Sequence, residues 1–162
     1  MYFKSLDGSE GFFPLSENYH ENGILKKTTA PTYLDSNIEI DIKTKAKKLA
    51  KNLNLYGVLA IELFELLDGS IVFNEIAPRP HNSFHWTLNG CNSSQFDILV
   101  RTICGLPVKD VISNGKWEMT NLIGQDVNNM SLYEDQNYIL HLYGKKHLKP
   151  GRKMGHFNKN IS

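Results

Sequence analysis

A chain of 162 residues is long enough for one domain, or for two small ones, with a real apolar core. Its 18 Lys and Arg residues nearly balance its 17 Asp and Glu residues, and the net charge of +1 provides no long-range field for holding nucleic acid or an anionic membrane. We therefore expect neither as a partner, and any anion must be bound by a local group of residues.

No segment indicates a membrane span or a secretion signal. The longest apolar stretch, residues 56–67, is interrupted by Glu62 and Glu65 and is too short to cross a bilayer. The N-terminus has no apolar signal region, so the cytoplasm is the expected location. Cys91 and Cys104 lack metal-ligand spacing and suggest no disulfide, and Cys104 is expected to be a small buried hydrophobe on a helix.

In chain order, residues 2–15 predict a β-hairpin with its turn at Asp7-Gly8. Residues 14–31, rich in Asn and Thr, predict mostly irregular structure. A helix is predicted at residues 38–53, because apolar residues recur there at helical spacing. Its lysines lie on the other side, which we interpret as a solvated surface.

The strongest hairpin signal is a pair of apolar runs, residues 58–67 and 70–76, joined by Asp68-Gly69. Both faces of this hairpin are largely apolar, so we expect both to be covered.

A second helix is predicted at residues 94–104, with Ser93 or Ser94 as its cap and Gly105 with Pro107 at its end. Its expected buried stripe consists of Phe96, Leu99, Val100 and Ile103. Short strands are expected around residues 117–123, 138–143 and 154–157, and a domain boundary at residues 105–107.

Two glutamates of the hairpin at residues 58–76 are the candidate metal-binding residues. If Asp68-Gly69 is a two-residue turn, Glu62 lies directly opposite Glu75. The other residues expected on that face are Ala60, Phe64, Ile71 and Phe73, whereas Glu65 falls on the opposite face. At about 5 Å and an effective dielectric near 20, the repulsion between the two carboxylates is roughly 3 kcal/mol.

A proton, an Arg or Lys side chain, or a divalent cation can offset this repulsion. Oxygen ligands of this kind suit Mg²⁺, which binds one or two carboxylates and completes its shell with phosphate oxygens and water. The hairpin alone leaves open the alternative that one glutamate has a structural basic partner or is exposed to solvent.

The segment after Glu75 contains a polar cluster that begins between two prolines and ends before a tryptophan. Pro78 and Pro80 stiffen the backbone and are expected to hold out four side chains that can hydrogen-bond an anion. These are Arg79, His81, Asn82 and Ser83. His81 and His85 are four residues apart, but Pro80 argues against a helix there, so no zinc site is predicted.

The run from Asn74 to Ser83, followed by His85-Trp86-Thr87, resembles the signature of the 5-(carboxyamino)imidazole ribonucleotide synthases, which are ATP-grasp ligases of purine biosynthesis. Further matching runs lie in collinear order at residues 17–20, 23–25, 121–128, 143–145 and 150–156. The resemblance covers nearly the whole chain. Phe84 stands where the family usually has glycine, which puts the contacts of Ser83 and His85 in doubt.

The resemblance implies an α+β fold, in which residues 1–107 are the C-terminal part of an ATP-grasp domain, an antiparallel sheet with helices, and residues 108–162 are a small, truncated β-rich C-terminal domain. It implies a ligase that uses ATP, bicarbonate and 5-aminoimidazole ribonucleotide, with Mg²⁺ or Mn²⁺ as cofactor and carboxyphosphate as activated intermediate. The family's N-terminal half, with its glycine-rich lid, would be a missing partner, and a homodimer is a further expectation.

The resemblance also implies roles for individual residues. Glu62 and Glu75 would bind the metal, His20 and Asn74 would act with Glu75 at the nucleotide, and Arg79 with His81 would be catalytic. The substrate-binding residues would be Asn82, Ser83, Lys145, Arg152 and Lys153. For the three basic residues among these, a solvated loop is the alternative.

We expect this chain alone to be inactive or nearly so. The main alternative function is a non-catalytic module that binds a nucleotide or sugar phosphate. A sister ATP-grasp enzyme, such as a formate-dependent transformylase or a biotin carboxylase, is a third possibility, although the Pro-His-Asn-Ser run and the C-terminal Gly-Arg-Lys-Met-Gly-His run favour the synthase.

Overall fold

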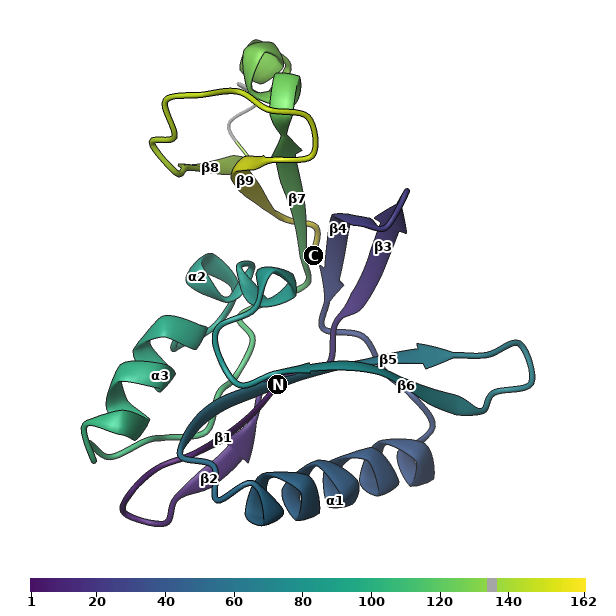
Figure 1. Ribbon diagram of the computed structural model, residues 1–162, viewed down its shortest axis with the longest axis vertical. Coiled ribbons are helices and arrows are strands. Elements are labelled where there is room, and N and C mark those ends of the chain that lie inside the picture. Colours follow the sequence, from purple (N-terminus) through teal and green to yellow (C-terminus); the bar gives the residue numbers. More distant parts are fainter. Residues whose placement is uncertain (134–136) are drawn as a thin grey trace. The chain divides into compact units, whose positions relative to one another are not determined.

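The computed structural model describes residues 1–133 and 137–162, and the chain forms two compact units that are interleaved along the sequence (Figure 1). The first unit takes in residues 1–14, 33–81 and 93–112, and the second takes in residues 15–32, 82–92 and 113–162. These compact units do not coincide with the predicted domains, residues 1–107 and 108–162, and those domains stay a prediction.

The first unit contains a four-stranded antiparallel sheet in the order β2-β1-β5-β6. The hairpin of β1 (Tyr2–Lys4) and β2 (Glu10–Phe12) is confirmed, and Gly8 adopts a φ of 91° in its turn. The second predicted hairpin is formed by β5 (Gly57–Glu65) and β6 (Ile71–Ala77). Because β6 lies at the edge of the order, its far side has no strand partner in the described sheet.

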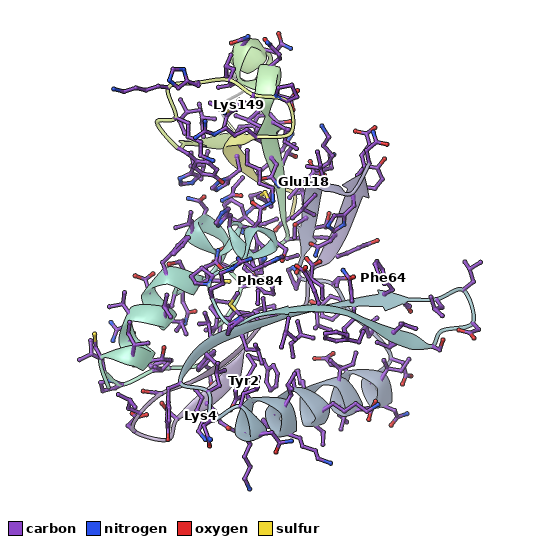
Figure 2. The ribbon with its side chains drawn as sticks, viewed as in Figure 1. Tyr2, Lys4, Phe64, Phe84, Glu118 and Lys149 are labelled. Carbon is purple, nitrogen blue, oxygen red and sulfur yellow. The ribbon has the colours of Figure 1, made fainter. Side chains whose placement is uncertain are left out.

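Helix α1 (Ser36–Asn52) covers one face of this sheet and confirms the predicted helix (Figure 1). It begins where the Asp35 carboxylate accepts hydrogen bonds from two backbone N–H groups of the first turn, which have no partner within the helix. Its Ala50 packs in a core cluster with Tyr2 of β1 and Leu59 of β5, and Figure 2 labels Tyr2 on this side of the sheet. Burying this apolar face holds α1 against the sheet.

Helix α3 (Gln95–Ile103) lies within one residue of the predicted limits at each end, but the predicted buried stripe was wrong for three of its four residues, since only Leu99 is half-buried. Phe96, Val100 and Ile103 are exposed, and the helix instead buries Gln95, Ile98 and Thr102. The two polar members of this stripe are tolerated because their side chains are hydrogen-bonded.

The cap of α3 is a capping box formed by Ser94 and Asp97. Cys104, which follows the helix, is exposed, so its predicted burial was also wrong. It lies at the C-cap, beyond the packed part of the helix.

The second unit contains a five-stranded antiparallel sheet in the order β3-β4-β7-β9-β8. The predicted irregular segment at residues 14–31 was wrong, because it contains β3 (Glu17–Glu21) and β4 (Ile24–Ala30). Asn22 and Gly23 join them with φ values of 50° and 74°, and an Asn-Gly pair readily adopts such positive angles.

The other three strands confirm the predicted ones and extend the last of them. They are β7 (Trp117–Ile123), β8 (Tyr138–Leu142) and β9 (Lys153–Asn160). The core beside them includes the buried side chains of Trp86, Trp117 and Met119.

The short η1 (Asn82–Phe84) precedes Trp86 and the short α2 (Thr87–Gly90) follows it, while η2 (Gly124–Tyr133) follows β7. Phe84 is buried, with an exposed fraction of 5%. Within the described residues, no helix combines the length and apolar character needed to cross a lipid bilayer.

Candidate functional site

The predicted pairing of Glu62 with Glu75 is confirmed, although the predicted two-residue turn was wrong. Near the turn the register is shifted by one residue, since the Leu66 N–H donates to the carbonyl of Ser70 at 2.8 Å. A β-bulge at Asn74 then restores the predicted register from Glu62 onward. The two departures compensate for each other, and the carboxylates meet as expected.

The bulge explains how two consecutive residues face the same glutamate. In a regular strand Asn74 and Glu75 would point to opposite faces of the sheet. Here the Asn74 amide donates to Oε2 of Glu62 at 3.4 Å, while Glu75 is the cross-strand partner of the same residue. Three oxygen-bearing side chains are thereby presented together.

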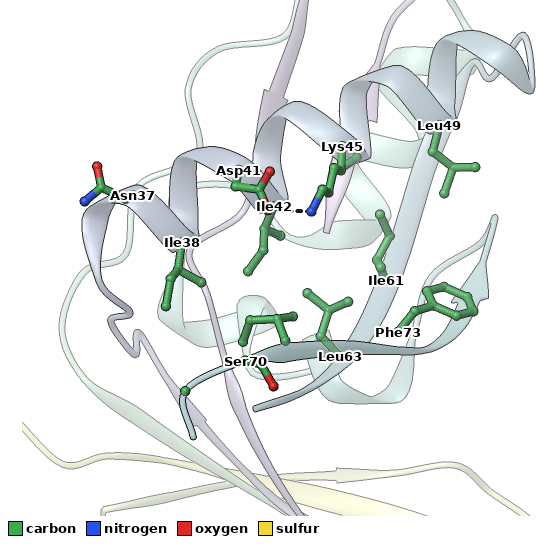
Figure 3. A pocket seen from close by; sticks show the side chains of 13 residues that line it. Asn37, Ile38, Asp41, Ile42, Lys45, Leu49, Ile61, Leu63, Ser70 and Phe73 are labelled. Carbon is green, nitrogen blue, oxygen red and sulfur yellow. Dashed lines mark hydrogen bonds and ion pairs between the residues drawn. The ribbon is translucent and has the colours of Figure 1, made fainter. Parts of the chain in front are cut away.

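The shifted register moves other residues to the opposite face. Ile71 and Phe73, expected beside Glu62, instead line a pocket of about 570 Å³ between the hairpin and α1 (Figure 3). On the glutamate face, Phe64 is 52% exposed and is labelled on the hairpin in Figure 2. The expectation that both faces are covered was therefore wrong for this structure.

His81 lies between the two carboxylates. Its Nδ1 is 3.6 Å from Oε1 of Glu62, and its Nε2 is 3.3 Å from Oε1 of Glu75. The side chains of Glu62 and His81 are only 12% and 11% exposed, whereas that of Glu75 is 54% exposed. The group is thus buried at one end and open to solvent at the other.

Burial lowers the pKa of His81 below its ordinary value, and this effect outweighs the two carboxylates, which raise it. The imidazole is therefore neutral at pH 7 and can donate one hydrogen bond, which suits the nearer Glu75. A neutral ring does not cancel the charge of two carboxylates. The arrangement consequently favours an additional cation between them.

These side chains fit a divalent metal ion. Among the described residues, Glu62, Glu75 and His81 form a group whose ligand atoms all lie within 4.8 Å of one another. Carboxylate oxygens suit Mg²⁺ or Mn²⁺, and the exposed Glu75 leaves room for water or phosphate oxygens in the coordination shell.

The residues beside this group lie differently from the prediction that all four are held out. Arg79 is exposed, and its guanidinium donates to the carbonyl of Pro80 at 2.9 Å. As whole residues, His81 and Ser83 are, in contrast, buried, with exposed fractions of 9% and 1%. Of these three side chains, only that of Arg79 is open to solvent.

Asn82 and Ser83 belong to the second unit, as does His20. Both the amide nitrogen and the amide oxygen of Asn82 are buried, and neither has a hydrogen-bond partner within the described chain. Unpaired buried polar atoms are costly, so this amide is suited to a ligand or to ordered water. His20 is exposed on β3, at the irregularity where the pairing with β4 shifts.

The three basic residues lie around the loop between β8 and β9. Lys145 donates to the carbonyl of Lys153, and its ammonium group lies 5.2 Å from the ring centre of Tyr143. Arg152 donates to the carbonyl of His147 at 3.3 Å, which holds the start of β9 to the loop. The first of these hydrogen bonds places the Lys145 side chain against the backbone of Lys153.

Two features of the structure were not found from the sequence. Gln95 is fully buried and bonded to the main chain of His81. In the second unit, His156 is stacked between His85 and His141, with ring centres 5.0 and 4.7 Å away. No local pattern signals either feature, because each joins residues that are far apart in the sequence.

Two family models match separate parts of the chain. Residues 1–96 match the ATP-grasp domain, and residues 118–160 match the phosphoribosylaminoimidazole carboxylase C-terminal domain. The N5-carboxyaminoimidazole ribonucleotide synthase of Bacillus subtilis is 42% identical over 159 residues, which cover 94% of this chain and 41% of that protein. A bifunctional purine synthesis protein of Dictyostelium discoideum is 41% identical and is covered over only 17% of its length.

Solved structures give the same result. The chain superimposes with a TM-score of 0.91 on the carboxyaminoimidazole ribonucleotide synthase of Aspergillus clavatus complexed with ATP, at 33% identity, covering 99% of this chain and 44% of that one. The chain thus spans less than half the length of the relatives compared here. Because the ATP-grasp domain matches more than half of its residues, the chain belongs to the ATP-grasp family.

Proposed function

We propose that this chain is the metal-binding and phosphate-binding portion of an ATP-dependent ligase that carboxylates 5-aminoimidazole ribonucleotide with bicarbonate. The observation that carries the proposal is the cross-strand pair of Glu62 and Glu75, joined by Asn74 through the bulge. The similarity to N5-carboxyaminoimidazole ribonucleotide synthases over 94% of the chain supports the choice of substrate.

In this proposal Glu62 and Glu75 hold Mg²⁺ or Mn²⁺ against the terminal phosphates of ATP, and Asn74 acts at the same nucleotide. The metal, when bound, neutralises negative charge on those phosphates. The buried Glu62 fixes one side of the site, while the exposed Glu75 faces the side from which the nucleotide enters. His20 is a further proposed nucleotide contact.

Arg79 and His81 are the proposed catalytic residues. The Arg79 guanidinium is exposed and positively charged, so it is available to an anion such as bicarbonate or a carboxyphosphate intermediate. The His81 imidazole is neutral and touches both glutamates, so it can exchange a proton beside the phosphates.

The proposed substrate-binding residues lie in the second unit. Asn82 offers a buried donor and a buried acceptor that lack partners in the described chain, and Ser83 follows it in the same turn. Lys145, Arg152 and Lys153 would bind the phosphate of the ribonucleotide. The hydrogen bond from the Lys145 ammonium group to the Lys153 carbonyl supports a loop with a defined conformation rather than a solvated loop.

The proposed enzyme works in the cytoplasm as a homodimer, and it needs the half of the relatives' length that this chain does not span. The polypeptide alone is expected to carry out no more than a trace of reaction. If the purified chain, mixed with ATP, bicarbonate and aminoimidazole ribonucleotide, gave multiple turnovers, this expectation would be wrong.

A chimera tests the function directly. The chain is joined to the preceding region of the Bacillus subtilis relative, and ADP release is measured with and without each of the other two substrates. We expect release that depends on both, and a loss of about a hundredfold or more in Glu62→Gln and in Glu75→Gln. Glu65→Gln is the matched control, because Glu65 is exposed on the opposite face of the same strand.

The alternative is a module that binds a nucleotide or sugar phosphate without turnover, and the limited coverage of the relatives keeps it open to test. It predicts ATP binding by the chimera without ADP release. Release that depends on formate in place of bicarbonate would instead indicate a sister ATP-grasp activity.

A further inference from the structure

Gln95 is the most buried polar side chain next to the candidate metal centre. It is the first residue of α3, its exposed fraction is 0%, and both ends of its amide are bonded to one residue. Its Oε1 accepts from the backbone N–H of His81 at 2.8 Å, and its Nε2 donates to the His81 carbonyl at 3.0 Å. The side chain thus holds the main chain of His81 at two points.

The two hydrogen bonds come from a residue at the fixed N-terminal end of a helix. The N-terminus of α3 is fixed by the capping box, in which Ser94 and Asp97 bond to each other's backbone N–H groups. Gln95, which directly follows the cap residue Ser94 as the first residue of the helix, is therefore held in place. A long polar side chain is ordinarily a poor choice for a buried helix face, unless its hydrogen bonds are needed there.

The segment that Gln95 bonds lies outside the helices and strands. Strand β6 ends at Ala77, and the chain reaches His81 through Pro78, Arg79 and Pro80. Proline lacks a backbone N–H, so the two prolines remove donors that could have anchored the segment. The direction of the His81 imidazole depends on its backbone, which makes the anchor from α3 important for the ring's approach to the carboxylates.

We propose that Gln95 is a positioning residue that holds the His81 ring between Glu62 and Glu75. The proposal rests on the proposed function for its consequence, since a correctly placed ring matters because the site binds a metal and phosphates. The geometric part stands without it. Removal of the amide should release the ring while the helix remains folded.

The test uses the whole chain and two variants of one helix. Gln95→Met keeps most of the side-chain volume and removes both hydrogen bonds. Thr102→Val is the matched control, because Thr102 is also buried on α3 and its hydroxyl bonds, among the described residues, to the carbonyls of Ile98 and Leu99 in that helix. Far-UV circular dichroism checks that each variant is folded.

The first readout needs no metal. Nuclear Overhauser contacts are measured between the ring protons of His81 and the side-chain protons of Glu62 and Glu75. We expect them in the wild type and in Thr102→Val, and we expect them to be lost in Gln95→Met. Unchanged contacts in Gln95→Met would overturn the proposal, whatever the function of the site.

The second readout is Mn²⁺ affinity, measured by water proton relaxation. Gln95→Met should weaken it about tenfold, as for other residues that orient the groups around a metal. In a His81→Ala background the same substitution should have no further effect, because the two residues act as a unit. An equal loss in both backgrounds would show a general structural role and refute positioning.

If Gln95→Met does not fold, Gln95→Glu replaces it, since a glutamate keeps an acceptor for the His81 N–H and loses the donor. Partial loss of the ring contacts is then expected, and full retention contradicts the proposal. A wild-type chain that binds no Mn²⁺ would count against the proposed function alone, because the contacts of the ring are measured without metal.

Discussion

The stability of the second unit should fall as the pH is lowered from 7 to 5, because of His156. Its ring lies between those of His85 and His141, and the residue is only 1% exposed. Burial, followed by the two neighbouring imidazoles, lowers the pKa of His156 to about 3. Its Nδ1 is bonded to the Tyr143 hydroxyl at 2.8 Å.

The direction and size of the effect follow from the two protonation states. In the unfolded chain the pKa of His156 is near its ordinary value of 6.5, so below that pH the unfolded state takes up a proton that the folded state refuses. The contribution is fully present above pH 6.5 and is lost progressively toward pH 3. At pH 5 the difference of 1.5 units amounts to about 2 kcal/mol of unfolding free energy.

Tryptophan fluorescence reports selectively on this unit, because the chain has two tryptophans and both Trp86 and Trp117 are buried in its core. Urea unfolding is followed at pH 7, 6 and 5 for the wild type and for His156→Gln. The variant should lose about 2 kcal/mol less than the wild type over this range.

Equal losses in the two proteins would refute the reasoning. A second measurement remains informative if the variant unfolds. The ring resonances of His156 in the wild type should keep the chemical shifts of a neutral imidazole between pH 7 and 5, and titration of the ring within that range would contradict its buried, uncharged state.

Three further substitutions test the fold and the site. Gly90→Ala should destabilise the second unit by about 1–3 kcal/mol in the same fluorescence assay, because the added Cβ would lie within 2.6–2.9 Å of atoms of both tryptophans; an unchanged unfolding midpoint would contradict this packing. Ser94→Ala removes the capping box with Asp97 and should lower the free energy of unfolding by about 1 kcal/mol, measured by urea unfolding of the chain followed by circular dichroism. Asn74→Ala should weaken Mn²⁺ binding less than Glu62→Gln does, and the reverse order would show that the amide rather than the carboxylate dominates.

The sequence determined the elements whose signals are local. Caps, turn residues and apolar periodicity specify α1, the hairpin of β5 and β6, and the ends of α3, since each depends on neighbours a few residues away. The same logic failed at β3 and β4, where the strands are polar and the Asn22-Gly23 turn was the informative signal.

The buried face of α3 could not be chosen from the sequence, because apolar residues occur around much of the helix. Phe96, Val100 and Ile103 form an apolar stripe, but the sheet and the His81 segment select the stripe that contains Gln95 and Thr102. Hydrophobic periodicity identifies a helix more reliably than it identifies the partner of each face.

For the candidate site, the sequence determined the carboxylates and the cost of placing Glu62 opposite Glu75. Only the tertiary structure decided that a bulge turns Asn74 toward them, that His81 lies between them, and that Gln95 holds that histidine. The physical reason is the range of the interactions involved. Turns and caps are satisfied within one segment, whereas a buried polar group selects whichever distant partner the packed chain brings within hydrogen-bonding distance.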